Sequence, residues 1–116
     1  MTDEFLKKLK DYGVNTDETF RRFMGNTDMY EKFLRKFSED RNYSLIGPAL
    51  EKNDFNAALE AAHSVKGVAA NLGLDPLAKA CSETVRLIRE GKNEEARKSY
   101  PAVEKAYADT MRLIGN

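Results

Sequence analysis

Apolar residues recur at intervals of three and four positions along almost the whole chain. The clearest example is the set Tyr30, Phe33, Leu34 and Phe37, whose i, i+3, i+4, i+7 spacing predicts one buried stripe on a helix. No segment alternates strictly between apolar and polar residues, and no turn dipeptide separates two β-rich runs. The pattern therefore predicts an all-α protein.

Capping residues and glycines mark where the helices should begin and end. The expected N-terminal caps carry hydroxyl, amide or carboxylate groups: Thr2, Thr16, Thr27, Ser44, Asn53 or Asp54, Asp75 and Asn93. The glycines expected to end helices are Gly13, Gly25, Gly73 and Gly91. Pro48 should lie in the first turn of its helix and Pro76 at the first helical position, whereas Pro101 should bend or split the last helix.

A chain of 116 residues is long enough to bury one hydrophobic core, so we expect a single domain over residues 1–116. Short connections between long amphipathic helices favour antiparallel neighbours. The helix that should run from residue 54 to Leu72 has a core face rich in alanine, which lets neighbouring helices approach closely. We predict a monomeric, up-down-up-down four-helix bundle with short additional helices at its N-terminus.

Composition and charge exclude several classes of function. The chain has 19 Lys and Arg against 19 Asp and Glu, and this balance argues against a dedicated nucleic-acid binder or a polybasic membrane anchor. No apolar run approaches the roughly 20 residues that span a bilayer. The N-terminal residues lack the apolar core of a signal peptide. Because the single cysteine cannot form an internal disulfide, we expect a cytoplasmic protein.

Residues that could carry chemistry are scarce. The chain contains one histidine, His63, and one cysteine, Cys81, too few for a structural zinc site with its about four ligands. It has neither a glycine-rich phosphate loop nor a nucleophile elbow. A hydrolase or transferase that uses Cys81 and His63 is an alternative, but Cys81 is expected to be a small buried residue and His63 to point outward. We expect no cofactor.

His63 lies outside the apolar stripe of its helix. On a wheel of about 100° per residue it falls roughly 140° from the centre of the stripe. Lys66 and Gly67 follow at i+3 and i+4, so a cation and a residue without a side chain lie one turn away. Glycine costs roughly 1 kcal/mol relative to alanine inside a helix, which suggests that the space is needed. With Ser64 also small, this histidine could accept a phosphoryl group, although an ordinary surface histidine is the simpler alternative.

These residues resemble the hallmark of a known family. The segments AAHSVKG and VAANLG are similar to the A-H-x-L-K-G helix of histidine phosphotransfer (HPt) domains. The lead-in from Phe55, F-x-x-A-L-x-x-A-A-H, and the preceding segment GNTDMYEKFLRKF also fit, and the resemblance covers about residues 14–114. It implies a phosphocarrier that takes a phosphoryl group from a receiver-domain aspartate or a histidine kinase and passes it to a response-regulator receiver.

The resemblance also implies a role for each site residue. His63 matches the phosphoacceptor, Lys66 the neighbouring cation and Gly67 the residue that leaves room for the partner. Such domains have no catalytic machinery of their own, so the magnesium ion is expected only on the partner receiver domain.

The sequence departs from the family pattern in the helix after His63. Many members have L-E or L-Q there, and the acid or amide hydrogen-bonds the unphosphorylated imidazole. Thr84 and Val85 occupy these positions here. The ring-orienting partner is therefore expected either to be absent or to be Glu83 or Thr84. Arg89 and Arg86 are candidates for a second cation near the site, with simple surface solvation as the alternative.

A partner should dock on apolar surface, because zero net charge gives little long-range steering. The short helices near the N-terminus carry more large apolar side chains than their core needs, and methionines suit surfaces that accept several partners. The expected docking residues are Phe23, Met24 and Met29. A second class of function is also open: a helical docking module that binds signalling partners but has lost transfer.

Overall fold

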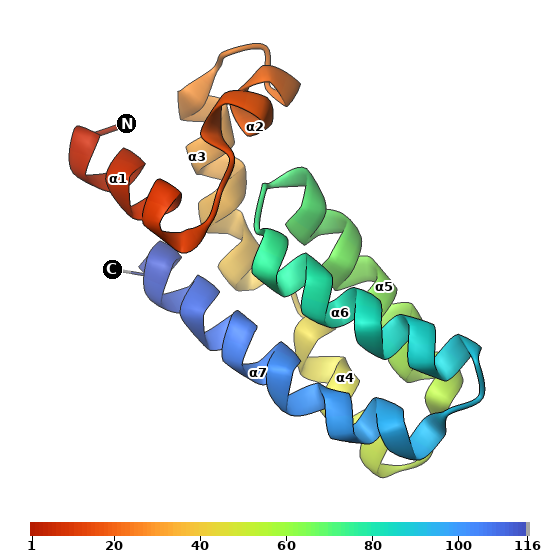
Figure 1. Ribbon diagram of the computed structural model, residues 1–116. Helices are drawn as coiled ribbons and strands as arrows, with labels where there is room; N and C mark the ends of the chain where they lie inside the picture. Colours follow the sequence, from red (N-terminus) through yellow and green to blue (C-terminus); the bar gives the residue numbers. More distant parts are fainter. Residues whose placement is uncertain (116) are drawn as a thin grey trace.

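The computed structural model describes residues 1–115, and every element in them is helical. Figure 1 shows their arrangement. In chain order the elements are α1 (Asp3–Tyr12), α2 (Thr16–Arg22), α3 (Thr27–Lys36), the 3₁₀ turn η1 (Phe37–Glu39), α4 (Asn42–Glu51), α5 (Phe55–Asn71), α6 (Asp75–Arg89) and α7 (Asn93–Gly115). The predicted all-α class is confirmed.

Helix α1 packs across the end of α7 (Figure 1). The Thr2 hydroxyl accepts a hydrogen bond from the N–H of Phe5, and Gly13 ends the helix in the left-handed conformation, both as predicted. The hydroxyls of Tyr12 and Thr110 lie 2.6 Å apart and join the two helices.

Helices α2 and α3 each begin one residue earlier than the threonines predict. Asn15 caps α2 and Asn26 caps α3, each accepting a hydrogen bond from the N–H three residues later. The predicted cap Thr16 is buried instead and lies at the first helical position. The asparagine amide oxygen accepts the capping hydrogen bond that a threonine hydroxyl would accept. The predicted caps are therefore wrong by one residue, but the predicted helices are present.

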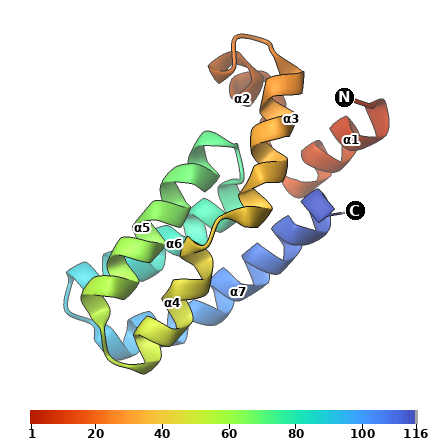
Figure 2. The ribbon, with the colours of Figure 1, turned by 180° about the vertical axis from the view of Figure 1, so that it is seen from behind.

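Helices α3 and α4 form one interrupted rod, joined through η1 (Figure 2). The break falls where it is expected, but α4 begins at Asn42, whose N–H donates to Asp40 Oδ1 over 2.8 Å. Ser44 is therefore inside the helix and not its cap. For the same reason Pro48 lies in the helix interior and not in the first turn.

The long helices α5, α6 and α7 complete an antiparallel bundle with α4 (Figures 1 and 2). Asp54 caps α5, as predicted, whereas Asp75 is the first residue of α6 and not its cap. Gly73 makes the α5–α6 turn at a φ of +74°, and a Cβ there would lie 2.4 Å from Thr19 Oγ1, so only glycine fits. Helix α7 continues unbroken through Pro101, so the expected split does not occur.

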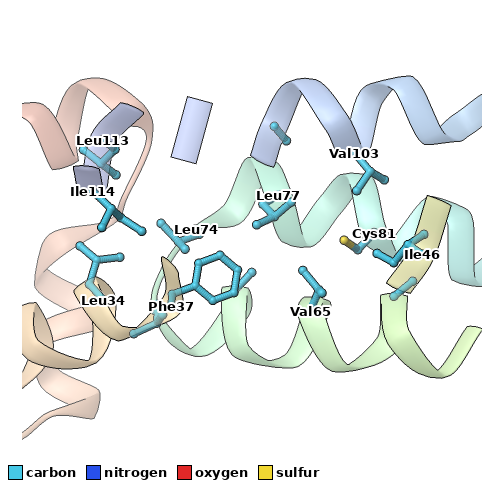
Figure 3. Packing of buried hydrophobic residues seen from close by; sticks show 14 of the residues in the cluster. Leu34, Phe37, Ile46, Val65, Leu74, Leu77, Cys81, Val103, Leu113 and Ile114 are labelled. Carbon is cyan, nitrogen blue, oxygen red and sulfur yellow. The ribbon is translucent and has the colours of Figure 1, made fainter. Parts of the chain in front are cut away.

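The core runs along the whole bundle and receives side chains from every long helix. Figure 3 shows Val65 of α5 facing Leu77 and Cys81 of α6, with Val103 of α7 above them. At the other end, Leu34, Leu113 and Ile114 close the core around α3 and the end of α7 (Figure 3). No helix within residues 1–115 is both long enough and apolar enough to cross a bilayer.

Candidate functional site

Helix α5 separates a buried face from an exposed one. Its expected core residues Ala58, Ala62, Val65 and Ala69 are fully buried, because α4 and α6 pack closely on the small side chains. His63 is exposed, as its position on the helical wheel predicts. The bundle therefore presents the only imidazole of the chain to solvent, midway along a helix that is capped at its start by Asp54.

The residues around His63 leave its surroundings open. Lys66 is half-buried and Gly67 is exposed, one turn further along the same helix. A Cβ placed on Gly67 would meet nothing within 4 Å, so the absence of a side chain is not required by packing inside the domain. Ser64 is exposed and lies next to His63 in the sequence.

Two grooves follow the side of α5 that faces α3 and α4. One lies against α4 and reaches Ser64; its lining includes Leu45, Pro48, Lys52, Glu60 and Ser64. The other lies against α3 and reaches Gly67; it is lined by Phe23, Phe33, Gly67, Val68, Asn71 and Leu72. The phosphoacceptor candidate thus lies beside surface that a partner could enter from the α3–α4 side.

Exposed apolar side chains lie along the second groove and in an adjoining hollow: Phe33 and Val68 line the groove, Met24 and Met29 line the hollow, and Phe23 lines both. Met24 is 96% exposed, Met29 44%, Phe33 47% and Val68 37%. Phe23 lies half-buried among them, with its ring 6.0 Å from that of Phe33. We call these five residues the apolar patch.

The apolar patch contains all three predicted docking residues and two that sequence reasoning missed. Met24 and Met29 are exposed as predicted, and Phe23 joins them to the groove. Phe33, in contrast, was expected in the core with Tyr30 and is instead half exposed. Phe33 lines the open groove between α3 and α5, so its side chain stays half exposed and does not enter the core.

Met24 has an unusual backbone as well as an exposed side chain. Its φ is +56° and that of Gly25 is +75°, so two consecutive residues between α2 and α3 are left-handed. This region disfavours residues other than glycine and asparagine, and such strain clusters at functional positions. The turn places the Met24 side chain almost wholly in solvent.

The α6 residues expected to orient the imidazole are engaged elsewhere. Val85 is 2% exposed and belongs to the core. Thr84 is fully buried, and its hydroxyl lies 2.6 Å from that of Ser99 on α7. The expectation that Thr84 turns toward the ring is wrong, because the α6–α7 interface already satisfies its hydroxyl. Among residues 1–115, no hydrogen bond to the His63 side chain is recorded.

Glu83 and Arg86 of α6 form an ion pair with each other. Arg86 lies 2.5 Å from Glu83 and 2.8 Å from Glu90, one turn away on either side. These ion pairs lower the pKa of both carboxyls, chiefly through the hydrogen bonds that Arg86 donates, and raise the pKa of the guanidinium. Arg86, one of the two candidates for a second cation, is thus already held in ion pairs at the surface, and its role in transfer stays a prediction. Arg89 is exposed, and its role stays a prediction.

Cys81 is fully enclosed in the core (Figure 3). Burial raises the pKa of its thiol to about 12, so the nucleophilic thiolate is essentially absent near neutral pH. Because His63 points to solvent while Cys81 is inside, the structure speaks against a hydrolase or transferase that uses this pair.

Comparison with known families matches residues 28–112 to the Hpt domain. The match covers α3 to α7 almost completely and includes His63, Lys66 and Gly67. Comparison with curated protein sequences and with solved structures gives no match. Hpt domains are phosphocarriers of phosphorelays that interact with kinases and receiver domains and are generally not enzymes. The chain belongs to the Hpt domain family.

Proposed function

We propose that His63 accepts a phosphoryl group from a receiver-domain aspartate or a histidine kinase and passes it to a response-regulator receiver. One observation carries the proposal: the only imidazole of this Hpt chain is exposed in mid-helix, beside Lys66 and beside the open space at Gly67. The ammonium of Lys66 would offset the negative charge that arrives with the phosphoryl group.

The transfer step uses the lone pair of one ring nitrogen. This nitrogen attacks phosphorus as the P–O bond to the partner aspartate breaks, and the carboxylate leaves with the bonding electrons. The proton on the other ring nitrogen can pass to solvent, because His63 is exposed. Phosphoryl transfer depends on positioning and charge stabilisation, and we propose that the receiver supplies the magnesium ion for it. The chain would act as a cytoplasmic monomer.

The direct test is incubation of the chain with phosphorylated receivers from the same genome. We expect acid-labile label on the parent chain and none on His63→Gln, since no other histidine is present. The substitution is at an exposed position, so the far-ultraviolet circular dichroism spectrum should stay that of the parent. Label retained by His63→Gln would exclude the proposed acceptor.

A second candidate function is partner binding without transfer. It is favoured by one observation: Val85 is buried and Thr84 is paired with Ser99, so the acid or amide that orients the ring in many relatives has no substitute at these positions. In that case phosphorylated receivers would bind the chain measurably, but no phosphoryl group would be transferred to His63.

A further inference from the structure

Arg22, at the end of α2, reaches across to the end of the His63 helix. Its Nη2 donates to the carbonyl of Ala70 over 3.1 Å, and its Nε donates to the carbonyl of Asn71 over 3.3 Å. Both acceptors belong to the last turn of α5. The last carbonyls of a helix have no partner within it, and a cation is favourable there. The carbonyl of Ala70 also accepts from the N–H of Gly73 over 3.2 Å, so Arg22 adds a cation at this end of α5 and a hydrogen bond to the carbonyl of Asn71.

The guanidinium is oriented from its own helix. Glu18 Oε1 and Thr19 Oγ1 each lie 3.4 Å from a terminal nitrogen of Arg22. Tyr30 of α3 adds a third link to the same end of α5, because its hydroxyl donates to the carbonyl of Leu72 over 2.7 Å. Figures 1 and 2 both place α2 beside this end of α5.

The position of Arg22 in the chain gives this contact a consequence for docking. Arg22 directly precedes Phe23 and Met24, and the left-handed turn at Met24 and Gly25 follows. Of the other exposed residues of the apolar patch, Met29 and Phe33 lie on α3 and Val68 lies on α5 itself. The contact of Arg22 with the end of α5 is thus one of the links that tie the Met24 side of the apolar patch to the helix that carries His63.

We propose that Arg22 is a positioning residue for phosphoryl transfer: by holding α2 on the carboxyl end of α5, it fixes the apolar patch relative to His63. The proposal rests on the proposed function, since it assigns Arg22 a part in receiver docking. Arg22 touches neither the phosphoryl group nor the imidazole in this scheme. It acts through the geometry of the surface that the receiver must match.

The test compares Arg22→Gln and Arg22→Lys with Arg21→Gln in the full chain. Arg21 is an exposed arginine on the same helix, and no polar contact of its side chain is recorded within residues 1–115. Transfer is measured from a phosphorylated receiver at increasing receiver concentration. We expect Arg22→Gln to raise KM about tenfold, which corresponds to the loss of about one charged hydrogen bond, with kcat within about twofold of the parent. Arg22→Lys should recover part of this loss, and Arg21→Gln should match the parent.

A distance measurement separates positioning from direct contact with the receiver. Spin labels are placed at Asp17→Cys on α2 and Asn56→Cys on α5, both exposed positions. Arg22→Gln should broaden the distribution of distances between the labels, and Arg21→Gln should not. A raised KM with an unchanged distribution would overturn the positioning role in favour of direct contact, and an unchanged KM would overturn it outright. If the parent chain shows no transfer, the proposed function fails and this proposal fails with it.

Discussion

The two sides of helix α5 differ in how they meet solvent. On the side of α2, α3 and α4, large apolar side chains are exposed: Met24, Met29, Phe33, Leu45 and Val68. On the side of α6 and α7, the surface carries intrahelical ion pairs, such as Arg86 with Glu83 and Glu90, and Lys105 with Asp109 at 2.8 Å. No large apolar side chain of α6 or α7 is among the exposed ones in residues 1–115.

The difference indicates which side a partner would use. The charges on the side of α6 and α7 would add little to the binding of a partner, because exposed ion pairs contribute only about 0–1 kcal/mol. Exposed apolar surface gains free energy whenever it is covered, and a contiguous patch of it marks a binding site. We therefore propose the side of α5 that faces α3 as the docking surface; the groove on this side is lined in part by Gly67.

The largest expected effect is the loss of this docking surface. The triple substitution Met24→Ser, Phe33→Ser and Val68→Ser removes three exposed side chains of the apolar patch, so the fold should remain. We expect transfer at low receiver concentration to fall about 100-fold, since about 1 kcal/mol of apolar contact is lost at each position. The measurement is the second-order rate constant of transfer from a phosphorylated receiver.

The matched control lies on the other side of the bundle. Lys79→Ser and Ala102→Ser change the groove between α6 and α7, and together they should leave the rate within about twofold, as is usual for surface substitutions away from a site. Equal losses in the two variants would contradict the assignment of docking to one side.

A bulky side chain at Gly67 should have the next largest effect. Gly67→Gln adds a side chain at the border between His63 and the apolar patch, where the free domain has open space. The unfolding free energy should be that of the parent or higher. Transfer should slow by about tenfold or more, equivalent to ~1.4 kcal/mol, because the steric conflict arises only in the complex. Transfer at the parental rate in a correctly folded variant would show that the partner does not need the open space at Gly67.

Lys66 on α5 and Arg86 on α6 should differ in their effect on transfer. Lys66→Ala removes the half-buried ammonium one turn from the imidazole, and we expect transfer to slow by about three- to tenfold through lost charge neutralisation. Arg86→Gln should leave the rate unchanged, because Glu83 and Glu90 already hold that guanidinium. Single-turnover kinetics with one receiver can compare them directly. A larger effect of Arg86→Gln would mean that its ion pairs open during transfer.

The sequence predicts most of the bundle because its helices are amphipathic and because capping residues and glycines mark many of their ends. The exposure of His63 follows from its distance to the alanine stripe, which small side chains and Val65 define without ambiguity. Phe33 shows where periodicity fails: spacing assigns a residue to a stripe but cannot tell how much of the stripe a neighbouring helix covers. Phe33 lines the open groove between α3 and α5 and stays half exposed.

Other features depend on contacts that spacing alone does not reveal. The pairing of Thr84 with Ser99 joins residues 15 positions apart, across the α6–α7 turn. The contact of Arg22 with Ala70 joins residues 48 positions apart. The engagement of Arg86, in contrast, could have been predicted, since Glu83 and Glu90 stand at i−3 and i+4 on one helix face.

The smallest expected effect is on stability. A comparison of Gly67 in α5 with Gly47 in α4 tests whether packing inside the domain requires the glycine at position 67. Gly67→Ala in α5 should raise the unfolding free energy by up to about 1 kcal/mol, because the added Cβ meets nothing within 4 Å and alanine favours the helix. Gly47→Ala in α4 should not gain this, since its Cβ would lie 3.0 Å from the hydroxyl of Tyr100 and 3.3 Å from that ring's Cζ. Urea denaturation of both variants measures the difference. If Gly67→Ala proves destabilising, the glycine serves the free helix, and its place beside His63 carries no information about a partner.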